Sequence, residues 1–458
     1  MNTGYITFYG KEYIYIEDNE KMHLVAKNKN DIDIVVMPDN FKKKDYFLKY
    51  SSDFHSCCQS YIIDTQYNNA KDIILTSKYT LNLIKDEISG IEITGEVIDA
   101  FFSPARYYFQ KKRENGSTIM DLIYDREEID SWEINYNTLS LKISLICGDI
   151  LQKGIASDLK LHPKIIVEFI PTSDYKLVYE IYQFIVRFMR LVVHTKNCGK
   201  FKVELYNYFD KKKSYIGFLN DYSIKTDAEN SHFDNWVVNY TTYKPYIKRL
   251  LQFAANNPDL SFNHFPLNFQ RISSEDYTVI DLLTLFSAFE KECSHNKSMY
   301  ETIDDSMVKT IKEELLTLIN DLKKNCQTDK EKEFLNNAKN RISQLNTQMG
   351  QKAKIVNAFT VLQKALNSSL INIFINTMSE VEKINVIADS LTQIRGKSIH
   401  ADAITEFTEQ EAQMLRFFEV LIYAQMLKRA GLNDEEIEAV VGAVLHCNYI
   451  LVKKIIND

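Results

Sequence analysis

The amino-acid sequence predicts an α+β fold in which a β-rich front precedes an all-helical C-terminal region. Through about residue 240, short β-branched and aromatic runs alternate in the manner of strands. From about residue 270, apolar residues recur at spacings of three and four, which is typical of amphipathic helices. The 27 tyrosines and 26 phenylalanines of the 458-residue chain suit a large strand content.

Turn residues separate the predicted strands of the front, as at Asn28–Asn30, Pro38–Asn40 and Asn115-Gly116. This pattern predicts one or two antiparallel β-rich units. The strand-like runs are YITFYG (5–10), YIYIE (13–17), DIDIVVM (31–37), DIILTS (72–77), GIEITGEVIDAFF (90–102) and TLSLKISLI (138–146).

The middle of the chain mixes strand and helix patterns. The segment 150–163 contains both Gly154 and Pro163 and indicates a break. A strand is predicted at 165–171, a helix at 174–193 and another strand at 200–209. We therefore expect a β-rich domain over 1–155 and an α+β region over 156–268, either separate from the first or continuous with it.

Residues 269–458 are predicted to form an all-helical bundle. Its first helix is expected within 273–294, with Ser274 at the cap position. Two charged helices joined at 325–329 predict a hairpin. Apolar residues recur in its first helix (Val308, Ile311, Leu315, Leu318, Leu322) and in its second (Phe334, Ala338, Ile342, Leu345). Further helices are expected at about 353–375, 379–394, 409–430 and 434–445.

Composition excludes several classes of protein. The net charge of −7 argues against a protein coated with nucleic acid, although short basic runs such as Lys42–Lys44 and Lys211–Lys213 could guide RNA locally. The seven cysteines are scattered, and neither a signal peptide nor a membrane-spanning run is recognisable. The sequence contains no P-loop, GxGxxG, HExxH or CxxC motif. We expect a soluble, reduced protein of the cytoplasm that needs no metal or other cofactor.

The most informative segment is LTQIRGKSIHADAI at 391–404, where four residues separate Arg395 from His400. Gly396 commonly ends a helix, so we expect a helix ending near Arg395, a tight turn, and a new helix beginning near Ser398. Such a corner would bring a guanidinium, an imidazole, the Lys397 ammonium and free backbone N–H groups together, which suits a phosphate. The structural alternative is that the Arg and the His only stabilise helix ends.

An R-x4-6-H element in an all-α bundle resembles the HEPN domains, many of which are metal-independent ribonucleases, and the resemblance covers about 271–458. The front, with GEVIDAFFSP at 95–104 and KIIVEFIP at 164–171, resembles the front of ApeA-like HEPN proteins, which are bacterial anti-phage abortive-infection factors. The residue after the motif Arg is often polar in HEPN nucleases, and here it is Gly396.

The resemblance implies RNA cleavage by attack of a 2′-OH on the adjacent phosphate. His400 would transfer protons, Arg395 would stabilise charge on the phosphate, and no metal would take part. Lys397 and Ser398 are weaker candidates for phosphate contacts. Glu290 and Glu292, on an early bundle helix, are weaker candidates for orienting the His or holding the Arg. HEPN sites are usually composite, so one motif per chain implies a homodimer or a higher even oligomer.

These features support a main hypothesis and two rivals. The first is an endoribonuclease of phage defence, with tRNA as one candidate target and the front as a sensor that responds to a phage-derived trigger. The second is a catalytically inactive HEPN-like module for dimerisation or nucleic-acid binding, with Gly396 marking the loss of activity. The third is a carbohydrate-binding or structural β protein with a helical tail.

Overall fold

A computed structural model divides the chain into two compact units, Met1–Leu260 and Ser261–Asp458, and each is considered by itself. The structure describes residues 2–8, 11–26, 46–52, 57–69, 72–84, 87–102, 109–114, 117–122, 129–150, 160–193, 198–223, 240–258, 277–296, 305–343, 350–366, 380–399 and 407–443.

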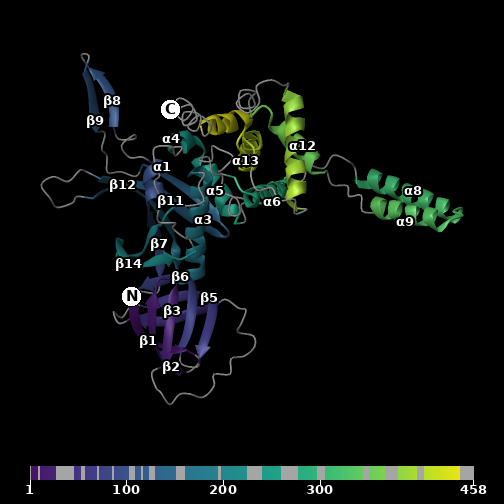
Figure 1. Ribbon diagram of the computed structural model, residues 1–458. Helices are drawn as coiled ribbons and strands as arrows, with labels where there is room; N and C mark the ends of the chain where they lie inside the picture. Colours follow the sequence, from purple (N-terminus) through teal and green to yellow (C-terminus); the bar gives the residue numbers. More distant parts are fainter. Residues whose placement is uncertain are drawn as a thin grey trace. The chain divides into compact units, whose positions relative to one another are not determined.

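The first unit is built on one antiparallel sheet whose strand order is β10-β11-β12-β7-β13-β14-β6-β3-β2-β1-β4-β5 (Figure 1). Its strands are β1 Asn2–Phe8, β2 Lys11–Asp18, β3 Lys21–Ala26, β4 Tyr46–Ser52, β5 Cys57–Asn69, β6 Asp72–Leu83, β7 Ile88–Thr94, β10 Asp130–Tyr136, β11 Leu139–Ile150, β12 Lys160–Thr172, β13 Lys202–Phe209 and β14 Lys212–Asp221. A separate hairpin pairs β8, Phe109–Glu114, with β9, Ser117–Leu122.

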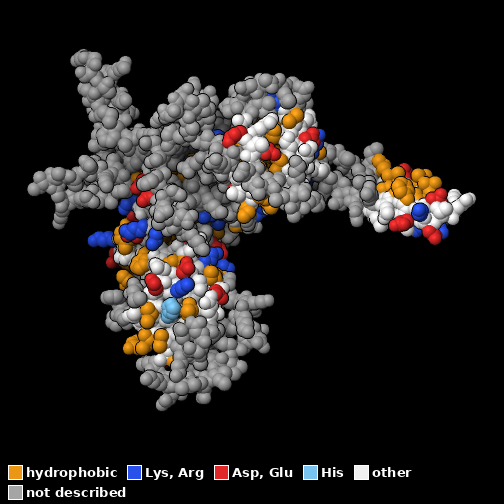
Figure 2. Space-filling model, in the orientation of Figure 1, with side chains coloured by type: hydrophobic (Ala, Val, Ile, Leu, Met, Phe, Trp, Pro, Cys, Tyr) orange, Lys and Arg blue, Asp and Glu red, His pale blue; other side chains and the backbone are white. Residues whose placement is uncertain are grey.

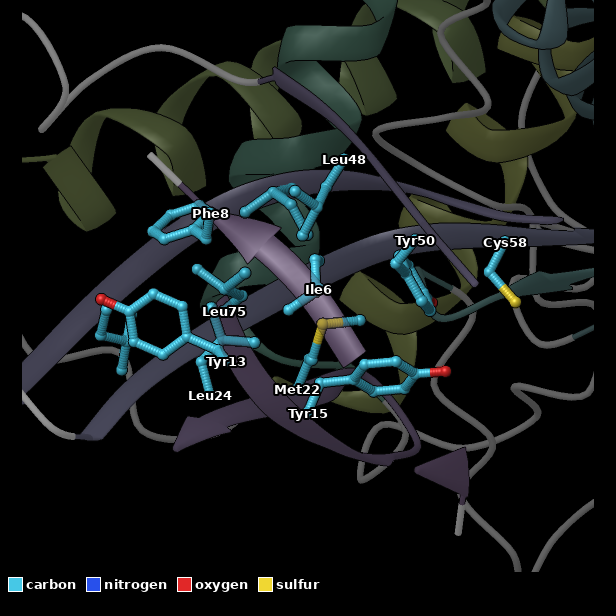
Figure 3. Close-up of a cluster of buried hydrophobic side chains, with 12 residues drawn as sticks. Ile6, Phe8, Tyr13, Tyr15, Met22, Leu24, Leu48, Tyr50, Cys58 and Leu75 are labelled. Atoms are coloured by element: carbon cyan, nitrogen blue, oxygen red, sulfur yellow. The ribbon is translucent and has the colours of Figure 1, made fainter. Parts of the chain in front are cut away.

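Six of these strands close into a ring, because β5 pairs with β6 as well as with β4. Alternation in β2 shows how the ring acquires a buried interior: Tyr13 and Tyr15 are buried, whereas Glu12 and Ile14 are exposed. Figure 3 shows the resulting cluster, in which aromatic and aliphatic side chains from several strands converge. Its members are Ile6, Phe8, Tyr13, Tyr15, Met22, Leu24, Leu48, Tyr50, Cys58, Ile62, Ile73 and Leu75.

The rest of the sheet is covered on one face by helices. The long helix α3, Tyr175–Val193, contacts both the edge strand β10 and the ring strand β6. Its Phe184 stacks on Tyr136 of β10 at 5.6 Å between ring centroids, and its Tyr179 stacks on Tyr79 of β6 at 3.7 Å. The same unit contains α1 Glu96–Phe102, α4 Tyr240–Tyr243, a 3₁₀ turn Lys244–Tyr246 and α5 Ile247–Asn256.

One expectation for the front differs from the structure. The run 90–102 is not a single strand, because the chain leaves β7 at Thr94 and residues 96–102 form α1. That helix buries Val97, Ile98, Phe101 and Phe102, so an apolar run that resembles a buried strand is here the inner face of a short helix. Strands from both sides of residue 155 are hydrogen-bonded in one sheet, since β12 lies between β11 and β7. The predicted strand at 31–37 lies outside the described residues.

The second unit is helical. Its helices are α6 Val279–His295, α8 Asp305–Lys324, α9 Asp329–Ser343, α10 Gln351–Leu362, α12 Glu380–Ile399 and α13 Glu409–Arg429, followed by a helix over 434–443. Helix α6 begins with a capping box in which Thr278 and Asp281 satisfy each other's backbone groups. The cap is therefore Thr278, whereas the expected cap residue Ser274 lies outside the described residues. Phe418 of α13 packs between Phe286 and Phe289 of α6 at about 5 Å between ring centroids.

The predicted hairpin is confirmed as α8 and α9. The side of α8 that faces α9 contains Leu316 and the buried Ile319, whereas a second row of apolar side chains is exposed. This exposed row is Ile311, Leu315, Leu318 and Leu322, at the spacing of four, three and four that the sequence shows. Within the described residues, no helix is both long and apolar enough to cross a membrane.

Candidate functional site

Arg395 lies within helix α12, which continues without interruption from Glu380 to Ile399. The expected turn at residues 396–398 is therefore wrong. Gly396 is an interior helical residue, and a Cβ atom added to it would meet no heavy atom within 4 Å. The packing of α12 compensates for the weak helix propensity of this glycine, which is about 1 kcal/mol below that of alanine.

Glu290 and Phe286 contact the Arg395 guanidinium, and Gln351 binds Glu290. Its Nη2 donates a hydrogen bond to Oε1 of Glu290 at 3.0 Å, and its Cζ lies 5.1 Å from the centre of the Phe286 ring. Gln351, at the first position of α10, donates its side-chain amide to the same Glu290 oxygen. The Arg395 side chain remains 28% exposed and that of Glu290 40% exposed, so the ion pair lies at the surface of the second unit.

The sequence of α6 explains why Phe286 and Glu290 act together. They are four residues apart and so lie on the same side of one helix. Phe286 also contacts Phe418 and is buried, so its ring is a rigid support for the guanidinium. Of the two weaker acidic candidates, Glu290 is thus the one that the structure places beside Arg395.

Glu292 has a different partner. It is fully buried and receives two hydrogen bonds from Arg429 in the last turn of α13, Nε to Oε2 at 2.9 Å and Nη2 to Oε1 at 2.8 Å. Positions two apart in a helix point about 200° away from each other, which is why Glu290 and Glu292 meet different arginines. Because the ion pair between Glu292 and Arg429 is bidentate and buried, it joins α6 to α13 and has a structural role.

The remaining motif residues are less fully described. Lys397 and Ser398 belong to the last turn of α12. His400 lies outside the described residues. The structure therefore brings Arg395 and Glu290 together.

The described arrangement can bind an anion. A guanidinium has five N–H donors in a planar fork, and the Glu290 bond engages one of them. The aromatic ring and the carboxylate hold the group in place, so little side-chain entropy remains to be lost when a phosphate binds. Phe286 could have been found from its spacing to Glu290, whereas nothing in the sequence connects Gln351 or Arg429 to the motif.

The comparisons with known proteins identify no relative: the chain matches no family model, no curated protein and no solved structure. In the described part of the chain, no three His, Cys, Asp or Glu side chains gather as a metal site would require.

Proposed function

We propose that this protein is a metal-independent endoribonuclease of the HEPN type that acts in bacterial anti-phage defence. The observation that carries the proposal is the held but partly exposed Arg395, which lies in a helical unit and precedes His400 by five positions. A cation that is held in a fixed position at the protein surface can bind a phosphate.

In the proposed reaction, a ribose 2′-oxygen attacks the adjacent phosphorus. The P–O2′ bond forms, the P–O5′ bond breaks, the 2′-OH loses its proton and the departing 5′-oxygen gains one. Arg395 stabilises the charge on the phosphate, and His400 exchanges one of the two protons, for which an imidazole is suited near neutral pH. The products are a 2′,3′-cyclic phosphate and a 5′-OH.

The proposed site is composite. In a homodimer, Arg395 of one protomer would act together with the histidine of the partner. This part of the proposal rests on the HEPN resemblance.

The experiment compares purified wild type with Arg395→Ala and His400→Ala. Each protein is incubated with total bacterial RNA in EDTA, with and without lysate of phage-infected cells, and the new RNA ends are mapped. We expect wild type alone to produce 2′,3′-cyclic phosphate ends. Equal cleavage by all three proteins would contradict the assignment.

The second candidate is a HEPN-like binding or dimerisation module without catalysis. Its supporting observation is that Arg395 already has partners in Glu290 and Phe286, which is compatible with a purely structural role. Folded, dimeric wild type that cleaves no RNA under any of these conditions would favour this candidate.

A further inference from the structure

The sheet of the first unit has a second face that combines aromatic rings with lysines. Directly opposed residues of an antiparallel pair lie on the same face, and the pairs Tyr206–Tyr215, Tyr206–Gly90 and Glu204–Phe218 define that face on β13, β14 and β7. The alternate residues, such as Val203, Leu205 and Ile91, are buried on the opposite, core face.

Three aromatic side chains of this face are open to solvent: Tyr208 is 44% exposed, Tyr215 51% and Phe218 46%. Tyr206 lies beneath them over Gly90, where a Cβ atom would come within 2.4 Å of the ring. A glycine at position 90 therefore allows a flat tyrosine to pack against the backbone of the sheet. Tyr206 also meets Tyr208 edge-on, with 5.7 Å between ring centroids.

Glutamates hold the exposed tyrosines in fixed orientations. The Tyr215 hydroxyl donates to Oε2 of the buried Glu92 at 2.7 Å, and the Tyr208 hydroxyl donates to Glu168. Burial raises the pKa of Tyr208 to about 12, with the Glu168 carboxylate adding to the effect, so this phenol remains a donor at neutral pH. Rings that are already oriented lose little entropy when a planar ligand stacks on them.

Lysines surround the rings. Lys213 Nζ lies 4.0 Å from the Tyr206 ring centre and 2.7 Å from Glu92, whose other oxygen accepts from Lys164 at 2.5 Å. Lys211 extends this group at the turn between β13 and β14, and Lys202 lies on β13, where it forms an ion pair with Glu204 at 2.8 Å. Figure 2 shows basic side chains beside apolar ones in the region where Figure 1 draws β7 and β14.

The charge of this face differs from that of the whole chain. On β7, β12, β13 and β14 and at the β13–β14 turn, four lysines (Lys164, Lys202, Lys211, Lys213) balance four acids (Glu92, Glu168, Glu204, Asp210), whereas the chain has a net charge of −7. Glu92 is buried under the two lysines that it binds, so an approaching ligand meets ammonium groups and aromatic rings. This combination suits a strand of alternating phosphates and bases.

We propose that this face, centred on Tyr208, Tyr215 and Phe218, binds single-stranded nucleic acid by stacking bases on the rings and placing phosphates near the lysines. That the strand is RNA rests on the proposed ribonuclease function. The first unit would then use this face to bind RNA, either the RNA that is cleaved or an RNA that triggers cleavage.

The test measures binding separately from cleavage. Full-length His400→Ala protein is titrated in EDTA against a fluorescein-labelled 12-nucleotide RNA of mixed sequence, and fluorescence anisotropy is recorded at two salt concentrations. Tyr215→Ala and Phe218→Ala are each expected to weaken binding about 5- to 100-fold, the usual effect of losing one stacked base. Lys213→Gln should make binding less dependent on salt.

A matched variant controls for the fold. Tyr5→Ala removes an exposed tyrosine from β1, outside this face, and should bind like the parent. Undiminished binding by the Tyr215→Ala, Phe218→Ala double variant would overturn the site. So would a folded parent that binds no RNA, or one that binds a soluble oligosaccharide instead.

A parallel titration with DNA of the same sequence tests the assignment to RNA, which tighter binding of the DNA would overturn. RNA binding that depends on Tyr215, in a wild-type protein that cleaves no RNA, would retain this face and reject the proposed nuclease. RNA cleavage by the wild type, together with variants that bind RNA like the parent, would support the proposed nuclease and reject this binding face.

Discussion

At the level of single residues, Glu290 and Glu292 show how two similar side chains on one helix acquire different roles. Glu290 forms a surface ion pair with Arg395, and Glu292 forms a buried bidentate pair with Arg429. Exposed pairs contribute about 0–1 kcal/mol to stability, whereas breaking a buried pair costs about 3–5 kcal/mol because one charge is left uncompensated.

We therefore predict that Glu290→Gln leaves the free energy of unfolding within about 1 kcal/mol of wild type but lowers RNA cleavage about tenfold or more, because Arg395 loses the group that orients it. Glu292→Gln should destabilise the helical unit by about 3 kcal/mol. Urea unfolding and single-turnover cleavage measure the two effects. Equal destabilisation by both substitutions would contradict the division of roles.

Glu92 supplies a second prediction at this scale. Burial alone would raise its pKa, but hydrogen bonds from Lys164, Lys213 and Tyr215 outweigh burial and lower the pKa to about 2. Because the folded pKa is below the usual 4.5, the stabilisation is complete above about pH 4.5 and is lost as the pH falls towards 2.

Urea unfolding of wild type and Glu92→Gln should show this window. Their difference in unfolding free energy should be largest near pH 6.5 and should shrink by about 1.4 kcal/mol for each pH unit below 4.5. A difference that is the same at pH 6.5 and pH 3.5 would show that the carboxylate charge is not what the two lysines stabilise.

At the level of secondary-structure elements, the continuity of α12 is the main difference from the local sequence pattern. We predict that Gly396→Ala raises the stability of the helical unit by about 0.5–1 kcal/mol, because alanine favours a helix and its Cβ would have free space. Thermal unfolding monitored by circular dichroism measures this. A loss of stability would instead indicate a left-handed turn at this position.

In the hairpin of α8 and α9, the spacing of apolar residues predicted the helix α8 correctly but did not identify which of its faces is buried. The regular row of Ile311, Leu315, Leu318 and Leu322 is exposed, and the neighbouring row with Leu316 and Ile319 faces α9. Both rows have helical spacing, so periodicity alone cannot select between them.

At the level of the whole molecule, the division into Met1–Leu260 and Ser261–Asp458 separates the sheet from the helical unit that contains Arg395. If the front restrains the nuclease, deleting residues 1–260 should increase toxicity in bacteria, and Arg395→Ala in the same truncated chain should remove it. Colony counts after induction measure this outcome. A truncated chain that folds and dimerises but stays harmless would contradict the restraint.

Much of the architecture follows from local pattern. Alternating aromatic and β-branched residues predicted β1, β2, β6, β7, β11, β12 and β13 at least in part, but not β3, β4, β5, β8, β9, β10 or β14. Spacings of three and four predicted α6, the α8–α9 hairpin and α13. These signals are readable because side-chain direction repeats every two residues in a strand and every 3.6 in a helix. The run 96–102 was misassigned because a short apolar stretch has too few residues to show either period.

The sequence by itself determined the α+β division, the helical character of the second half, and Arg395 and Glu290 as candidates. Only the tertiary structure decided that six strands close into a ring, that one sheet crosses residue 155, that α12 runs through Gly396, and which arginine each glutamate binds. The physical reason is distance along the chain. Strand partners and ion pairs join residues more than a hundred positions apart, such as Glu290 with Arg395, and their choice depends on packing that no local pattern encodes.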